Sequence, residues 1–226
     1  MATFVLIHGA GDVAWSWHLL AAELRAKGHD VVAPDLPCED DGAGLDEYAN
    51  TVIEHLGDRR DPVVVGHSFG AFTATLVAGR VPVSMLVLLA GMVPAVGESP
   101  GDWWANTGYS AAVAEARRAG DPVGDDDPYV SFYHDVPREL SEEAMSRGRG
   151  QSETPSRSPW PLDALPDVPT RYVLCTEDRF FPPEFLRRVV AARLRIVPDE
   201  IAGSHCVPLS RPKELADLLA GYAAGA

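Results

Sequence analysis

The segment Pro62-Val63-Val64-Val65-Gly66-His67-Ser68-Phe69-Gly70 decides the fold of this chain. Its valines predict a short buried strand, and the stretch 71–78 that follows is compatible with a helix. Between them lies Gly-x-Ser-x-Gly, the pattern of a sharp turn that exposes a serine hydroxyl. The serine of such a turn is strained, and Gly66 and Gly70 let the strand and helix backbones approach closely. We therefore predict that Ser68 is a nucleophile.

A second match, Gly97-Glu98-Ser99-Pro100-Gly101, lies in a proline-rich loop with no strand before it. The residue after a nucleophile in this turn must supply a backbone N–H to the developing oxyanion, and Pro100 has none. We therefore exclude Ser99.

Short apolar runs on either side of Ser68 predict the rest of the sheet, at 3–7, 30–34, 62–66, 84–90, 170–175 and 194–198. They alternate with helical patterns, which indicates an α/β fold with a mostly parallel six-stranded sheet flanked by helices. One helix is expected to begin at Pro182-Pro183 and bury Phe185, Leu186, Val189 and Val190. The last helix follows Pro212 and carries an apolar stripe of Leu215, Leu218, Leu219 and Tyr222.

The stretch 94–169 breaks the alternation with prolines, glycines, an acidic run and several aromatic residues. It reads as a small cap insertion over the carboxyl ends of the strands, where ligands bind in open α/β sheets. No linker composition divides the chain, so we expect one domain over residues 1–226.

Composition limits the partners. The chain has 19 Lys and Arg residues against 33 Asp and Glu residues, a formal charge of −14 that disfavours nucleic acid and anionic lipid surfaces. We expect no membrane segment, because no apolar run approaches twenty residues. The 3 cysteines form neither a metal pattern nor a disulfide framework, which predicts a cytoplasmic protein. Serine hydrolysis needs no metal or organic cofactor, so we expect none.

A serine nucleophile needs a base, and in this kind of fold the order along the chain is serine, carboxylate, histidine. Of the 7 histidines, only His134 and His205 follow Ser68, and His134 lies in the insertion. His205 is therefore the predicted base, on a loop expected to be flexible and exposed. The carboxylate should follow an earlier strand, which leaves Asp178, its neighbour Glu177 and, more weakly, Asp199.

An oxyanion hole requires two backbone donors. One is expected from Phe69, directly after the nucleophile, and the other from Ala10 in the loop His8-Gly9-Ala10-Gly11 after the first strand. His8 itself is expected to brace that loop by hydrogen bonding.

These motifs resemble the small α/β-hydrolases that include plant methyl-ester hydrolases, hydroxynitrile lyases and bacterial esterase-like relatives. The resemblance rests on 4–10 with Trp15-Ser16-Trp17, on 33–36, on 66–70, on Thr176-Glu177-Asp178-Arg179 and on Gly203-Ser204-His205. It implies Ser68, His205 and Asp178 as the triad, in preference to Glu177, with Ala10 and Phe69 as oxyanion donors. Hydroxynitrile lyases of this group have a threonine and a lysine where this chain has Gly9 and Cys206.

The sequence thus predicts a serine hydrolase of carboxylesterase type acting on a small-molecule ester or related acyl compound. A thioester hydrolase or a lyase using the same triad, and a binding protein without catalysis, are the alternatives. Trp103, Trp104 and Tyr109 of the insertion are candidates for lining the substrate pocket, although they are equally suited to packing the insertion onto the core. A homodimer remains open.

Overall fold

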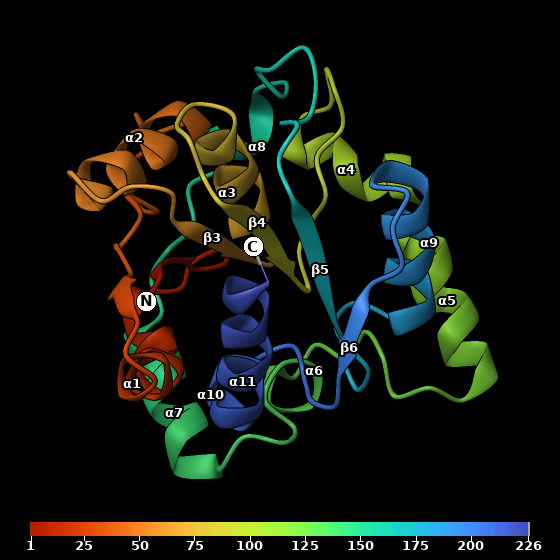
Figure 1. Ribbon diagram of the computed structural model, residues 1–226. Coiled ribbons are helices and arrows are strands. Elements are labelled where there is room, and N and C mark those ends of the chain that lie inside the picture. The colour runs from red at the N-terminus through yellow and green to blue at the C-terminus, as the bar shows by residue number, and fades with distance from the viewer. Residues whose placement is uncertain (226) are drawn as a thin grey trace.

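The computed structural model describes residues 1–225, which form a parallel sheet of six strands in the order β2-β1-β3-β4-β5-β6 (Figure 1). The strands are β1 (Thr3–Ile7), β2 (Asp30–Val32), β3 (Val63–His67), β4 (Met85–Leu89), β5 (Thr170–Cys175) and β6 (Asp199–Ile201). The predicted fold class is confirmed. The first five strands lie within two residues of their predicted positions.

The sixth strand was predicted wrongly at 194–198 and lies at β6 instead. Leu194 ends the preceding helix, and Arg195 adopts a left-handed backbone with φ of 58°, so the chain turns where a strand was expected. Val197 in that run is 90% exposed. The chain pairs with β5 only afterwards, where Glu200 lies opposite Leu174.

Helices connect all the strands. Between the strands and after β6 lie the 3₁₀ helix η1 (Ala14–Trp17) and helices α1 (His18–Ala26), α2 (Leu45–Leu56), α3 (Gly70–Ala78), α9 (Pro183–Arg193), α10 (Val207–Ser210) and α11 (Pro212–Ala224). The insertion adds α4 (Pro100–Thr107), α5 (Tyr109–Ala119), α6 (Pro128–Ser131), α7 (Arg138–Arg147) and α8 (Thr154–Arg157). The predicted starts of α9 and α11 and their apolar faces are confirmed.

The sheet separates two cores because successive side chains of a strand point to opposite faces. Val5 and Ile7 of β1 pack with α2, α3 and α9, whereas Phe4 and Leu6 pack with α1 and α11. Figure 1 shows α1 and α11 beside each other, although they come from opposite ends of the chain. This packing fixes the central strands from both sides, and with them the loops at their carboxyl ends.

The strand order reverses between β1 and β3. The chain leaves β1 toward β2 and then returns to place β3 on the other side of β1. The connections after β1 and β3 therefore diverge to opposite faces and leave a crevice at the carboxyl ends of these two strands. The loop after β1 begins at His8 and the turn after β3 contains Ser68, so both predicted parts of the oxyanion hole lie at this crevice.

The segment between β4 and β5 consists of α4 to α8 and their connections, with no strand among its described residues. It spans the predicted insertion at 94–169. Across residues 1–225, no helix combines the length and the apolar character needed to cross a bilayer.

Candidate active site

Ser68 forms the turn between β3 and α3. Its φ of 52° is a left-handed backbone conformation that costs energy for a residue with a side chain. Three backbone hydrogen bonds hold it: the Ser68 N–H donates to the Leu89 carbonyl at 3.1 Å, and the N–H groups of Ala71 and Met92 donate to the Ser68 carbonyl at 3.2 and 3.0 Å. Within residues 1–225 the Ser68 hydroxyl makes no hydrogen bond, so its oxygen is free to react in the cavity that it borders.

The glycines of the motif allow this turn to pack tightly. A Cβ atom at Gly70 would lie 2.3 Å from the His8 carbonyl oxygen, and one at Gly66 would lie 2.5 Å from Cβ of Ala74. Both are distances that real Cβ atoms do not adopt. The glycines therefore bring α3 against β3 and against the end of β1, and the Ser68 turn against the Ala10 loop.

Ser99, of the second Gly-x-Ser-x-Gly match, has a structural role. Its side chain accepts a hydrogen bond from the Asp102 N–H at 3.1 Å and caps the N-terminus of α4, with Pro100 as the first residue of that helix. It does not border the cavity that contains Ser68.

His205 and Asp178 form a buried pair. The His205 Nδ1 lies 2.8 Å from the Asp178 Oδ2, and the two side chains are 3% and 0% exposed. The other carboxylate oxygen of Asp178 accepts hydrogen bonds from the N–H groups of Phe180 at 2.8 Å and Phe181 at 2.9 Å. A carboxylate fixed in this way holds Nδ1 protonated, which leaves the His205 Nε2 to accept a proton.

The rival carboxylates lie elsewhere. Glu177 is exposed, and its carbonyl oxygen, not its side chain, accepts a hydrogen bond from His134 at 2.8 Å. Asp199 accepts a hydrogen bond from the Tyr222 hydroxyl at 2.6 Å on the edge strand β6. Among the three candidates, only Asp178 contacts His205.

The expectation that His205 lies on an exposed loop was wrong. Phe132, Phe180 and Phe181 surround its ring, with centroid distances of 5.4, 5.2 and 5.4 Å, all near T-shaped. Phe132 comes from the insertion, 73 positions before His205 in the sequence and out of reach of any local pattern. These rings shield the ion pair that proton transfer would create from bulk water.

His67 supports His205 from the other side, a role that the sequence did not reveal. Its Nε2–H donates to the His205 carbonyl oxygen at 2.9 Å, and the ring centroids are 4.7 Å apart. Burial holds the pKa of His67 well below its ordinary value, and the nearby His205 lowers it further. A neutral His67 therefore fixes the backbone of His205 without adding a positive charge beside the His205 ring.

The predicted oxyanion donors border the same cavity. Ala10 and Phe69 both line it, as do Ser68 and His205. Within residues 1–225 neither the Ala10 N–H nor the Phe69 N–H donates a backbone or side-chain hydrogen bond. Gly9 makes the close approach possible, since a Cβ there would lie 3.2 Å from Cβ of Ser68. Two free amides beside a strained serine are the arrangement that stabilises a tetrahedral oxyanion.

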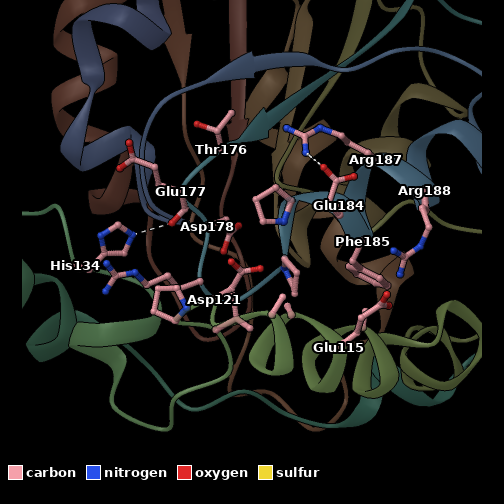
Figure 2. A pocket seen from close by; sticks show the side chains of 18 residues that line it. Glu115, Asp121, His134, Thr176, Glu177, Asp178, Glu184, Phe185, Arg187 and Arg188 are labelled. Carbon is pink, nitrogen blue, oxygen red and sulfur yellow. Dashed lines mark hydrogen bonds and ion pairs between the residues drawn. The ribbon is translucent and has the colours of Figure 1, made fainter.

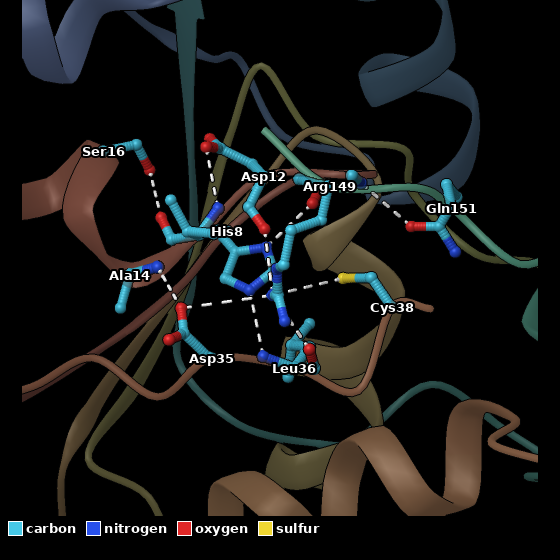
Figure 3. Close-up of polar contacts among 12 residues, drawn as sticks. His8, Asp12, Ala14, Ser16, Asp35, Leu36, Cys38, Arg149 and Gln151 are labelled. Carbon is cyan, nitrogen blue, oxygen red and sulfur yellow. Dashed lines mark hydrogen bonds and ion pairs between the residues drawn. The ribbon is translucent and has the colours of Figure 1, made fainter. Parts of the chain in front are cut away.

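His8 braces the Ala10 loop, as predicted. Its Nε2 accepts a hydrogen bond from the Leu36 N–H at 3.0 Å, so its Nδ1 is the protonated nitrogen and donates to the Gly9 carbonyl at 2.9 Å (Figure 3). The insertion adds two more contacts: Gln151 accepts from the Gly11 N–H at 3.0 Å, and the Arg149 N–H donates to the Gly11 carbonyl at 2.7 Å. The loop is thus fixed from β1, from the residues after β2 and from the insertion.

The cavity over Ser68 has a volume of about 420 Å³, and the insertion supplies much of its wall. Trp104 lines it, as do Phe132 and Phe180.

Trp103 does not line the cavity, which corrects the prediction. Its side chain is 0% exposed, and its Nε1–H donates to the Val93 carbonyl at 3.0 Å. Tyr109 also lies outside the lining and donates to the Phe180 carbonyl at 3.0 Å. Successive helical residues point about 100° apart, so only one of two adjacent tryptophans faces the cavity.

A larger hollow of about 710 Å³ lies between α5 and α9 (Figure 2). It is lined by charged side chains of both signs, and it includes Asp178 but neither Ser68 nor His205. We place the candidate active site in the smaller cavity, because Ser68, His205 and the two free amides meet there. Across residues 1–225, no three His, Cys, Asp or Glu side chains are grouped to hold a metal ion.

The comparisons with known proteins agree with this architecture. The model of the alpha/beta hydrolase family matches residues 4–218. The chain belongs to this family. The rice esterase PIR7B (Oryza sativa subsp. japonica) is 27% identical to it over 96% of this chain and 93% of its own length. An alpha-hydroxynitrile lyase of Arabidopsis thaliana is 26% identical over 97% of this chain and 96% of its own length.

The fold of this alpha/beta hydrolase also matches solved structures. The crystal structure of polyneuridine aldehyde esterase superposes with a TM-score of 0.78, covering 99% of both chains at 22% identity. The likeness at this identity concerns the fold.

Proposed function

We propose that the protein is a serine hydrolase of carboxylesterase type, with Ser68 as nucleophile, His205 as base and Asp178 as the carboxylate that orients it. The observation that carries the proposal is the convergence at one cavity of the strained Ser68, the buried His205–Asp178 pair and two free amides. Membership of the alpha/beta hydrolase family and the esterases among the relatives support it.

The first half of the reaction forms an acyl-enzyme. The His205 Nε2 takes the Ser68 hydroxyl proton as Oγ attacks the ester carbonyl carbon. The carbonyl oxygen becomes an oxyanion and accepts hydrogen bonds from the Ala10 and Phe69 N–H groups. The tetrahedral intermediate then collapses, the carbon–oxygen bond to the alcohol breaks, and protonated His205 gives its proton to the departing alkoxide.

The second half releases the acid. Water gives a proton to His205 and attacks the acyl carbon, and the resulting intermediate expels the Ser68 oxygen, which recovers its proton from His205. Asp178 stays ionised and stabilises the imidazolium formed in both halves. The products are the free carboxylic acid and the alcohol, and the enzyme returns to its starting state.

A lyase is the second candidate, since an alpha-hydroxynitrile lyase is among the relatives. Departing cyanide needs a nearby positive charge, and the cavity lining among residues 1–225 contains no lysine or arginine. Gly9 and Cys206 also stand where the resemblance places the threonine and lysine of the lyases. These features favour hydrolysis over cyanohydrin cleavage.

Product analysis separates the candidates. We expect the purified protein to convert members of a panel of esters, varied in acyl and alcohol size, to equal amounts of free acid and alcohol. Hydrolysis of thioesters with the same acyl groups is measured in parallel, because the same triad could cleave them. We expect no cyanide release from mandelonitrile above the buffer rate. Cyanide release without hydrolysis of any ester or thioester would contradict the proposal.

A further inference from the structure

The cavity over Ser68 is apolar and aromatic with one acidic exception. Its wall includes Trp104, Phe132, Tyr133 and Phe180, as well as the methionines Met92 and Met145. Asp12 is the only Asp or Glu in the lining among residues 1–225. It lies two residues beyond Ala10, on the loop that supplies one of the proposed oxyanion donors. An acidic residue in a lining that is otherwise mostly apolar needs a physical reason, because the proposed triad does not use it.

Asp12 lacks a positive partner. Its Oδ1 accepts a hydrogen bond from the Val13 N–H at 2.8 Å, and among residues 1–225 no Lys, Arg or His nitrogen lies within 4.0 Å of its carboxylate. The neutral His8 bonds to the Gly9 carbonyl and to the Leu36 N–H instead. Among residues 1–225, the Asp12 carboxylate therefore has no cation paired with it.

Arg149 is the nearby cation, but its side chain is directed elsewhere (Figure 3). Its Nη2 donates to the main-chain carbonyls of Asp12 at 3.0 Å and Leu36 at 2.9 Å, and lies 4.0 Å from the carboxylate of Asp35. Arg149 thus holds the backbone of the loop and does not pair with the Asp12 carboxylate. Burial raises the pKa of Asp12 above its ordinary value, and the hydrogen bond from the Val13 N–H opposes this shift only in part.

We propose that the cavity recognises substrates that carry a cationic nitrogen, a protonated amine or a quaternary ammonium, held between the Asp12 carboxylate and the aromatic walls. This inference rests on the proposed function, since it names the substrate class of the same site. Aromatic faces attract cations through the ring quadrupole, and a carboxylate provides the opposite charge. The formal charge of −14 adds a long-range attraction for cations.

Two isosteric esters test the proposal. Butyrylcholine carries a trimethylammonium group, and 3,3-dimethylbutyl butyrate replaces its nitrogen with carbon, so the pair differs in charge and not in shape. We expect kcat/KM for butyrylcholine to exceed that for the neutral ester by about tenfold or more. We expect Asp12→Asn to lower the ratio of the two kcat/KM values by at least about tenfold, because the amide keeps the oxygen that accepts from Val13 but loses the charge.

Glu54→Gln is the matched control, since Glu54 is exposed on α2 and its loss changes the net charge equally. This variant should keep the wild-type ratio. The inference is overturned if the wild-type enzyme does not prefer the cationic ester, or if Asp12→Asn lowers both values of kcat/KM by the same factor. In the second case, Asp12 would serve only to shape the loop.

Binding to the Ser68→Ala variant tests the cation site without turnover. We expect calorimetry to detect tetramethylammonium binding to this variant and to show at least about tenfold weaker binding when Asp12→Asn is added. Absence of binding, or equal binding to both variants, would overturn the inference. If no ester is hydrolysed but tetramethylammonium binds in an Asp12-dependent manner, the proposed function fails and the cation site stands.

Discussion

Replacement of Ser68 with alanine is expected to lower kcat for ester hydrolysis by a factor on the order of 10⁴ or more. The substitution removes the oxygen that attacks the carbonyl, and no other hydroxyl in the turn can take its place. The Ser68 hydroxyl makes no hydrogen bond within residues 1–225, so its loss should shift the thermal unfolding midpoint by no more than about 2 °C. Initial rates and a thermal melt of the same preparation measure both effects.

Ser99→Ala is the control for this experiment, because Ser99 is the other serine in a Gly-x-Ser-x-Gly match. Its side chain caps α4, so alanine should destabilise the fold by about 1 kcal/mol and leave kcat near the wild-type value. Full turnover in Ser68→Ala, or a loss confined to Ser99→Ala, would show that the nucleophile has been assigned incorrectly.

The second large effect is expected from Asp178→Asn, with a fall in kcat on the order of 10⁴. The amide oxygen of asparagine would keep the hydrogen bonds from the N–H groups of Phe180 and Phe181 and turn the NH₂ group toward His205. His205 Nδ1 would then accept a hydrogen bond, and the proton would move to Nε2. A histidine protonated at Nε2 cannot accept the proton of Ser68, so the site keeps its shape but loses its base.

Glu177→Gln provides the comparison, as it makes the same chemical change one residue earlier on an exposed side chain. It should retain kcat near the wild-type value. The kcat of both variants across the pH range of stability, with circular dichroism to check the fold, measures the difference. A loss in Glu177→Gln with normal turnover in Asp178→Asn would reverse the assignment of the carboxylate.

The strained turn at Ser68 was predictable from sequence because its constraints are local. Gly66 and Gly70 are required by contacts within one strand, turn and helix, and Pro100 excludes the rival match by its missing N–H. The order of serine, carboxylate and histidine along the chain also selected His205. Burial of Asp178 beside His205 was not decidable from the residues alone, since Glu177 has the same chemistry and differs only in the direction of its side chain.

Long-range packing accounts for what the sequence did not reveal. Phe132 covers His205 from the insertion, and no local pattern connects the two residues. Arg195 ends the expected strand at 194–198 by adopting a left-handed backbone that apolar periodicity does not detect. The neighbours Trp103 and Trp104 have the same chemistry in the sequence, yet one fills the core and the other faces the cavity.

Covalent labelling with a fluorophosphonate tests the central claim most directly. The serine oxygen displaces fluoride from the probe and becomes phosphonylated, a reaction that requires a base to activate the hydroxyl and an oxyanion hole to receive the phosphonyl oxygen. The label therefore reports the assembled site and requires no knowledge of the substrate. Peptide mass spectrometry should find one equivalent of adduct, located on Ser68 and absent from Ser68→Ala. An unlabelled wild-type protein, or an adduct on any other serine, would contradict the account.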